Sequence, residues 1–154
     1  VGLKPGCFYM SSSGKGAAGI ILAQHLTGLG FAMHGVTATS EFHLPSRTAK
    51  IANDTARALG LDLVVSEEEV VNFDNFVGAG YGIPTPGMVE ALKLVARMEG
   101  ILLDPVYSGK GMDGLIDQVT RGLFAKDSDV VFLHTGGSAG LFGYPDQFDL
   151  PGYI

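Results

Sequence analysis

Short apolar runs alternate with longer segments of helical periodicity along the chain. Gly6–Met10 and Phe31–Ala38 have the length and composition of buried strands. A helix is predicted after each strand, over Ala17–Leu29 and over Pro45–Leu59, and Gly60 would end the second helix. This alternation of strand and helix predicts a mostly parallel sheet with helices on both faces.

The second half of the chain continues the same pattern. Thr85 is suited to cap a helix whose first residue is Pro86, and Gly100 would end that helix. The other predicted elements are shorter: strands at Leu61–Val65, Ile101–Leu103 and Val130–His134, a helical turn at Ser66–Val71 and a helix at Gly111–Arg121. We therefore interpret residues 1–154 as a single three-layer α/β domain.

Composition excludes several classes of protein. With 46% apolar and 17% charged residues, 154 residues can form one domain with a real core. The net charge of −6 and the lack of a Lys/Arg cluster argue against nucleic-acid binding. The apolar runs are too short to span a bilayer, and no signal peptide is visible, so we expect no membrane partner. The single cysteine, Cys7, is typical of a cytoplasmic protein, and its apolar surroundings predict a small buried hydrophobe rather than a nucleophile.

The Ser/Gly-rich segment Ser11–Gly16 connects the first strand directly to a helix. Ligands bind at the carboxyl ends of strands in open parallel sheets. Small residues let backbone amides converge there, and the helix dipole adds partial positive charge, which favours phosphate. The segment matches neither a Walker A loop nor GxGxxG. Taken alone, it fits a phosphate site and a plain tight turn equally well.

Two later loops carry further candidate groups. In Asp104–Lys110, Tyr107 and Ser108 would project from a strand end, whereas the spacing of Lys110 favours a solvent-exposed residue at a helix start. In the second loop, the glycines after His134 permit close approach of the backbone to a ligand. No second histidine or carboxylate joins His134 at metal-ligand spacing, so we predict a satisfied core or strand-end histidine and no metal site.

Four motifs together resemble one protein family. The chain is similar, in order and spacing, to the C-terminal half of the D-cysteine desulfhydrase and 1-aminocyclopropane-1-carboxylate deaminase family, through GYGIPTPG at Gly80–Gly87, EGILLDPVYSGK at Glu99–Lys110, GLID at Gly114–Asp117 and FLHTGG at Phe132–Gly137. The similarity extends over nearly the whole chain. It implies the pyridoxal 5'-phosphate (PLP) cofactor and the large-domain part of a tryptophan-synthase-β-like fold.

The resemblance also assigns roles to individual residues. It implies a phosphate-binding loop at Ser12, Ser13, Gly14, Lys15 and Gly16, two active-site tyrosines at Tyr81 and Tyr107, a residue facing the pyridine nitrogen at Ser108, and a pair beside the ring at Thr135 and Gly136. Periodicity alone would place Tyr81 simply at the edge of the core. Family members usually have threonine in place of Gly16 and glutamine in place of Ala17, so one side-chain contact to the phosphate is absent here.

Ser108 bears on which reaction the resemblance implies. The deaminases have a glutamate here, which keeps the ring nitrogen protonated, whereas a serine hydroxyl offers only a neutral hydrogen bond. A weaker electron sink favours β-elimination from D-cysteine, L-cysteate or a related amino acid, giving pyruvate and ammonia. Tyr81 and Tyr107 would orient the substrate carboxylate or move protons. The alternatives are an activity like that of 1-aminocyclopropane-1-carboxylate deaminase, or a non-catalytic phosphate-binding, PLP-binding or assembly module.

The resemblance places the lysine that attaches the cofactor N-terminal to everything in this sequence. Neither Lys15 nor Lys110 occupies its motif. We therefore expect no covalent cofactor attachment in this chain and no activity without a complementing half. Half of a two-domain enzyme should also expose an apolar patch of several hundred Å². This predicts a homo-oligomer.

Overall fold

Four parallel strands form one sheet in the computed structural model, which describes residues 2–148. The spatial order is β3-β2-β1-β4, with the strands at Val71–Phe73, Ala32–Thr37, Pro5–Ser12 and Asp129–Phe132. β1 is central, since Cys7 lies opposite Ala32 of β2 and opposite Val130 of β4. The predicted parallel sheet is confirmed.

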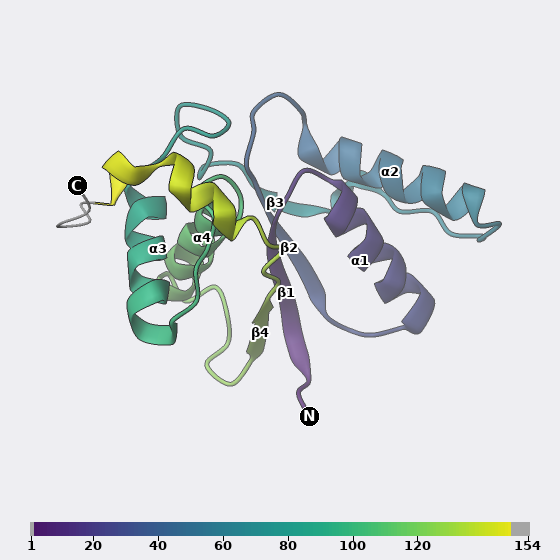
Figure 1. The fold of residues 1–154 in the computed structure, drawn as a ribbon. Helices are drawn as coiled ribbons and strands as arrows, with labels where there is room; N and C mark the ends of the chain where they lie inside the picture. Colours follow the sequence, from purple (N-terminus) through teal and green to yellow (C-terminus); the bar gives the residue numbers. More distant parts are fainter. Residues whose placement is uncertain (1, 149–154) are drawn as a thin grey trace.

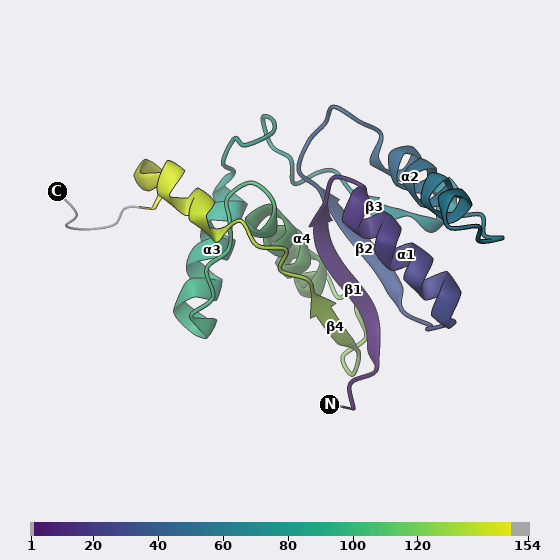
Figure 2. The ribbon, with the colours of Figure 1, turned by 45° about the vertical axis from the view of Figure 1, so that its right-hand side comes forward.

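Helices cover both faces of this sheet, as the alternating pattern predicts. Figures 1 and 2 show α1 (Lys15–Thr27) and α2 (Leu44–Ala58) on one side and α4 (Ser108–Thr120) on the other. α3 (Pro86–Glu99) packs on the outside of α4. Three short 3-10 helices complete the fold: η1 (Glu67–Glu69), η2 (Ser138–Gly143) and η3 (Pro145–Gln147).

β1 contributes alternate side chains to the two sides of the sheet. Met10 packs with α1 and α2, whereas Cys7 and Tyr9 pack with Val36 and a set of aromatic rings on the other side. This is the period of two expected of a strand buried on both faces. The Cys7 side chain is buried, and burial raises the pKa of its thiol to about 11, which confirms a small hydrophobe rather than a nucleophile.

The ends of α3 follow the sequence signals. The Thr85 hydroxyl accepts a hydrogen bond from the amide of Met88 at 3.2 Å, and Pro86 occupies the first turn. Gly100 ends the helix in the left-handed conformation, with φ 68°. No helix within residues 2–148 is long and apolar enough to cross a membrane.

Three predicted elements differ in the structure. Leu61–Val65 is not a strand, because the side-chain amide of Asn53 takes both backbone groups of Val65, at 2.8 and 2.9 Å. The edge strand β3 lies further along the chain, after the predicted helical turn, which is confirmed as η1. Ile101–Leu103 forms no strand either. The helix predicted from Gly111 begins at Ser108, which brings Ser108 and Lys110 into its first turn.

Candidate functional site

A cavity of about 360 Å³ lies at the carboxyl end of β1, where the three candidate loops meet. Its lining comes from the end of β1, the start of α1, the segment before α4 and the segment after β4: Met10, Ser11, Ser12, Ser13, Gly16, Asp104, Tyr107, Thr135, Gly136 and Gly137. Small-molecule sites commonly have volumes of about 300–1,000 Å³. The fold therefore assembles one pocket from segments more than a hundred residues apart.

The start of α1 supplies unpaired backbone donors to this cavity. Gly14 caps the helix with φ 105°, a conformation that favours glycine, and its amide donates to the Ser12 hydroxyl at 2.9 Å. The first helical bond runs from the Ala18 amide to the Gly14 carbonyl. The amides of Lys15, Gly16 and Ala17 therefore have no acceptor within the helix. Such a helix start is suited to an anion.

Gly16 is paired with an unusual neighbour. A Cβ at Gly16 would lie 2.8 Å from Cε of Met10, a contact closer than real Cβ atoms make. Met10 is buried and lines the cavity. Its terminal methyl group therefore occupies the space next to position 16 and gives the cavity an apolar wall there.

Asp104 organises the second loop, and sequence reasoning gave it no role. Its carboxylate accepts hydrogen bonds from the amides of Val106, Tyr107 and Ser108 at 2.7–2.9 Å and from the Ser108 hydroxyl at 2.6 Å. Burial alone would raise the pKa of Asp104, but these four hydrogen bonds outweigh it, and the pKa lies below its ordinary value. The carboxylate thus fixes the start of α4 and holds Tyr107 at the cavity.

Ser108 is buried beneath this network and does not line the cavity. Its hydroxyl donates to Asp104 and accepts a hydrogen bond from the Asp104 amide at 2.7 Å. A hydroxyl has a single proton to donate. The predicted contact of Ser108 with a ring nitrogen would therefore require this bond to be exchanged, and the acidic group that reaches the cavity is Asp104.

Tyr81 and Tyr107 meet at the rim of the cavity. The Tyr107 hydroxyl donates to the Tyr81 hydroxyl at 3.1 Å, and the ring centroids are 5.8 Å apart with an edge-to-face arrangement. Tyr81 does not line the cavity and is 54% exposed, so it does not pack its ring on the core edge. The hydrogen bond with Tyr81, together with burial, raises the pKa of Tyr107 to about 12. Tyr107 is therefore protonated at neutral pH.

The loop after β4 is shaped by His134 and two glycines. The ring of His134 accepts from the Gly136 amide through Nδ1 at 3.1 Å and contacts the Leu102 carbonyl through Nε2 at 3.0 Å. Both ring nitrogens are paired, which confirms a satisfied histidine. Gly136 and Gly137 have φ of 94° and 89°, and a Cβ at Gly137 would lie 3.0 Å from Asp104. Glycine is required for this close approach.

The structure thus gathers most, but not all, of the predicted site residues. The cavity is lined by Ser12, Ser13, Gly16, Tyr107, Thr135 and Gly136, and beside it lie Gly14, Lys15, Tyr81 and Ser108. The prediction of an exposed Lys110 is wrong, because its side chain is fully buried and its Nζ donates to two backbone carbonyls. Neither Lys110 nor the exposed Lys15 lines the cavity.

Met10 and Asp104 are lining residues that the sequence analysis does not identify, and Ser11 and Gly137 are lining residues that it includes only as parts of candidate loops. Ser11 and Gly137 belong to loops that were already candidates, so the loop boundaries were the available signal. Asp104 stands four residues before Ser108 with Pro105 after it. That spacing is typical of a carboxylate that accepts bonds from the next backbone amides.

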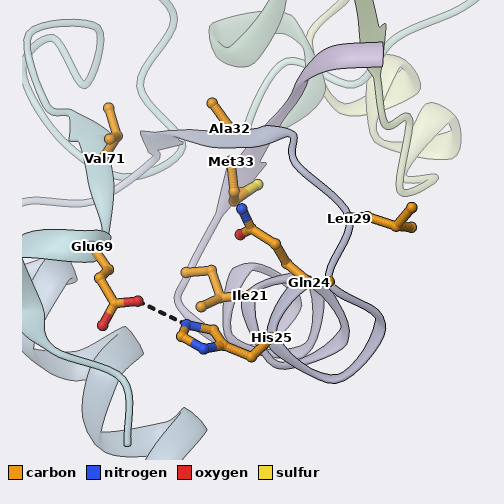
Figure 3. A pocket seen from close by; sticks show the side chains of 9 residues that line it. Ile21, Gln24, His25, Leu29, Ala32, Met33, Glu69 and Val71 are labelled. Carbon is orange, nitrogen blue, oxygen red and sulfur yellow. Dashed lines mark hydrogen bonds and ion pairs between the residues drawn. The ribbon is translucent and has the colours of Figure 1, made fainter. Parts of the chain in front are cut away.

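A second cavity, of about 460 Å³, lies at the other end of the sheet (Figure 3). It is bordered by the end of α1 and by Ala32 and Val71, the first residues of β2 and β3. His25 Nε2 and Glu69 Oε2 lie 2.7 Å apart across it. Both side chains are about one-third exposed, so this pair is a surface contact that joins α1 to η1. None of the predicted site residues lies there.

Comparisons with known proteins agree with the motifs. A family model described as pyridoxal-phosphate dependent enzyme matches residues 2–136. The chain is 37% identical over 142 residues to 1-aminocyclopropane-1-carboxylate deaminase of Burkholderia ambifaria, covering 90% of this chain and 41% of the relative. It is 38% identical over 140 residues to a probable 1-aminocyclopropane-1-carboxylate deaminase of Schizosaccharomyces pombe, covering 88% and 40%.

A solved structure described as an ACC deaminase homologue has the same fold. It superposes with a TM-score of 0.84 at 26% sequence identity, covering 96% of this chain and 44% of that chain. The predicted fold class is therefore confirmed. The chain spans about two-fifths of the length of the curated relatives that it matches.

Proposed function

Because this chain belongs to the family of pyridoxal-phosphate dependent enzymes, we propose that it is the part of a lyase that grips the cofactor phosphate and frames the ring. One observation carries the proposal: the amides at the start of α1, the Tyr107 side chain and the Thr135–Gly137 loop border a single cavity. Since the chain covers only part of its relatives, the activity of the whole protein is proposed together with it.

The chemistry of the lining suits this cofactor. A phosphate dianion needs several donors, and the hydroxyls of Ser12 and Ser13 and the free amide of Gly16 lie together at the positive end of a helix. The one carboxylate among the described lining residues, Asp104, already accepts four hydrogen bonds. It therefore presents little unpaired negative charge to an anion.

We propose a small amino acid as substrate, with 1-aminocyclopropane-1-carboxylate first because the relatives carry that name. When bound, PLP supplies an electron-withdrawing ring that stabilises negative charge on the substrate. Tyr107, protonated at neutral pH, would hold or deliver a proton at its phenol oxygen, and Tyr81 would orient that oxygen through their hydrogen bond. A second candidate is β-elimination from D-cysteine or L-cysteate, which the neutral Ser108 supports once its hydroxyl exchanges the bond with Asp104 for one with the ring.

Ammonia release distinguishes the two candidates. The chain would be assayed alone and mixed with the amino-terminal half of the Burkholderia ambifaria deaminase, with each of the three amino acids. Release from 1-aminocyclopropane-1-carboxylate supports the deaminase, and release from D-cysteine or L-cysteate alone supports β-elimination. A mixture that binds PLP but releases no ammonia from any of them contradicts both substrate proposals.

The proposed phosphate site can be tested by introducing aspartate at two positions of α1, Gly16 and Gly19. Gly16→Asp places a carboxylate at the cavity, and we expect PLP to bind at least ~10-fold more weakly, a loss of about 1.4 kcal/mol. Because a side chain at position 16 also meets the terminal methyl group of Met10, the circular dichroism spectrum and thermal unfolding of G16D must match those of the parent chain before its affinity is interpreted. Equilibrium dialysis measures the dissociation constant.

Gly19→Asp is the matched control. Gly19 lies on the same helix with no atom within 4 Å of its added Cβ, and it does not line the cavity. We expect G19D to lose less affinity for PLP than G16D, because its carboxylate lies one helical turn further from the cavity and is exposed to water. Equal affinities of G16D and the parent chain, or equal losses in G16D and G19D, would contradict the proposed phosphate site.

A further inference from the structure

The segment that carries Tyr81 has little structure of its own. Between β3 and α3, residues 74–85 form turns without a helix or strand. Only two backbone hydrogen bonds close within it, from Val77 to Asp74 at 3.4 Å and from Ile83 to Gly80 at 3.3 Å. Several of its glycines have positive φ. What holds Tyr81 at the cavity rim must therefore come from outside the segment.

One external contact comes from the buried lysine of α4. Lys110 Nζ donates to the carbonyl of Val77 at 2.6 Å and to the carbonyl of Gly80 at 3.0 Å, which directly precedes Tyr81. No carboxylate within residues 2–148 pairs with this amine, and burial lowers the pKa of Lys110. Burial of an amine whose described partners are all carbonyls costs free energy, and an apolar side chain would fill the same space at a lower cost. Its placement connects the Tyr81 segment to α4, the helix that directly follows Tyr107.

A second hydrogen bond to this segment comes from the end of the described chain. The Tyr144 hydroxyl donates to the carbonyl of Gly82 at 2.8 Å. Tyr144 follows η2, which packs near α3 through Leu141. Tyr81 therefore stands between two anchored carbonyls, Gly80 on one side and Gly82 on the other.

We propose that Lys110 and Tyr144 are positioning residues that hold the Tyr81 hydroxyl against that of Tyr107. The proposal rests on the proposed function, in which this tyrosine pair serves the cavity. Neither residue lines the cavity, so both act through the Tyr81 segment. Lys110 donates to two carbonyls of the segment and Tyr144 to one, so we expect Lys110 to contribute more to the position of Tyr81.

The test follows the phenol of Tyr107 by NMR of the chain with tyrosine isotopically labelled at Cζ, titrated with base. The bond with Tyr81 is the largest cause of the raised pKa of Tyr107. In Lys110→Met, the pKa of Tyr107 is expected to fall toward the ordinary value of about 10, as in Tyr81→Phe. Tyr144→Phe is expected to cause a smaller fall. Lys126→Met, which removes an exposed lysine, should leave the titration unchanged.

The direction of the shift separates positioning from simple loss of charge. Simple loss of charge would not lower the pKa of Tyr107: loss of an ammonium group would raise it, because a tyrosinate would lose an attractive neighbour, and loss of an amine that is already neutral would leave it unchanged. Loss of the Tyr81 bond lowers it. In a Lys110→Met and Tyr81→Phe double variant, we expect no shift beyond that of Tyr81→Phe alone.

An unchanged or raised pKa of Tyr107 in K110M with a native circular dichroism spectrum overturns the proposal. If K110M loses that spectrum, the test uses Tyr144→Phe, which deletes only one hydroxyl group. An unchanged pKa of Tyr107 in that variant then overturns the proposal. PLP affinity of the parent chain is measured separately. Failure to bind PLP would contradict the proposed function. The tyrosine titration would still test whether Lys110 and Tyr144 position Tyr81.

Discussion

Asp104→Ala is expected to lower the free energy of unfolding by about 3–5 kcal/mol. The substitution leaves the amides of Val106, Tyr107 and Ser108 and the Ser108 hydroxyl without their acceptor. Asp104 is 4% exposed, so water can replace the carboxylate only after local rearrangement. The start of α4 should loosen, and Tyr107 should move from the cavity. Urea unfolding followed by circular dichroism gives the stability.

The same carboxylate predicts a specific dependence of stability on pH. The pKa of Asp104 in the folded chain lies below its unfolded value of about 3.9, so its contribution is complete above that pH. The contribution is lost as the pH falls through the folded pKa. Asp104→Asn should remove this part of the acid slope, whereas Asp127→Asn, at an exposed position, should preserve it. Parallel slopes for the parent chain and D104N would contradict the role assigned to Asp104.

Gly109→Ala should destabilise the fold by about 1–3 kcal/mol, although alanine is the better helix former. Gly109 lies where α4 crosses α3, and an added Cβ would lie 2.8 Å from the Asp104 carbonyl oxygen. It would also come within 2.9 Å of the side chains of Leu92 and Met88. The backbone oxygen cannot move aside cheaply, because it accepts the Gly109 amide at 2.8 Å.

Gly19→Ala is the control for this substitution, with the opposite sign. Gly19 lies inside α1 on an exposed surface, and no atom lies within 4 Å of an added Cβ. Alanine should therefore stabilise the chain there by about 0.5–1 kcal/mol. If thermal unfolding shows that both variants are stabilised, or that both are destabilised, close packing at Gly109 does not explain the effect of G109A.

Much of the fold was accessible from pattern because the deciding contacts are local. Thr85, Pro86 and Gly100 mark α3 through bonds that span a few residues. Leu61–Val65 has the composition of a strand, but Asn53 of α2 takes its backbone groups, and that partner cannot be read from periodicity. The prediction of a solvent-exposed Lys110 is wrong for the same reason, since its acceptors lie 33 and 30 residues earlier in the chain.

In the candidate site, too, the features that depend on local sequence could be predicted and those that depend on distant contacts could not. Ser11–Gly16 was visible as a loop before a helix, because the chemistry of an anion site is built into one short segment. That Tyr107, Thr135 and Gly136 share its cavity followed from resemblance, and Asp104 was missed because its partners are backbone amides. The pairing of Tyr81 with Tyr107 joins residues 26 positions apart and needs the fold to be seen.

The contact between Met10 and Gly16 constrains how this pocket can evolve. Met10 belongs to the core under α1 and α2 and also lines the cavity, so packing against these helices limits which side chains can replace it. A side chain larger than glycine at position 16 therefore requires a shorter side chain at position 10. Across homologous sequences the two positions should covary, with a large residue at one accompanied by a small residue at the other.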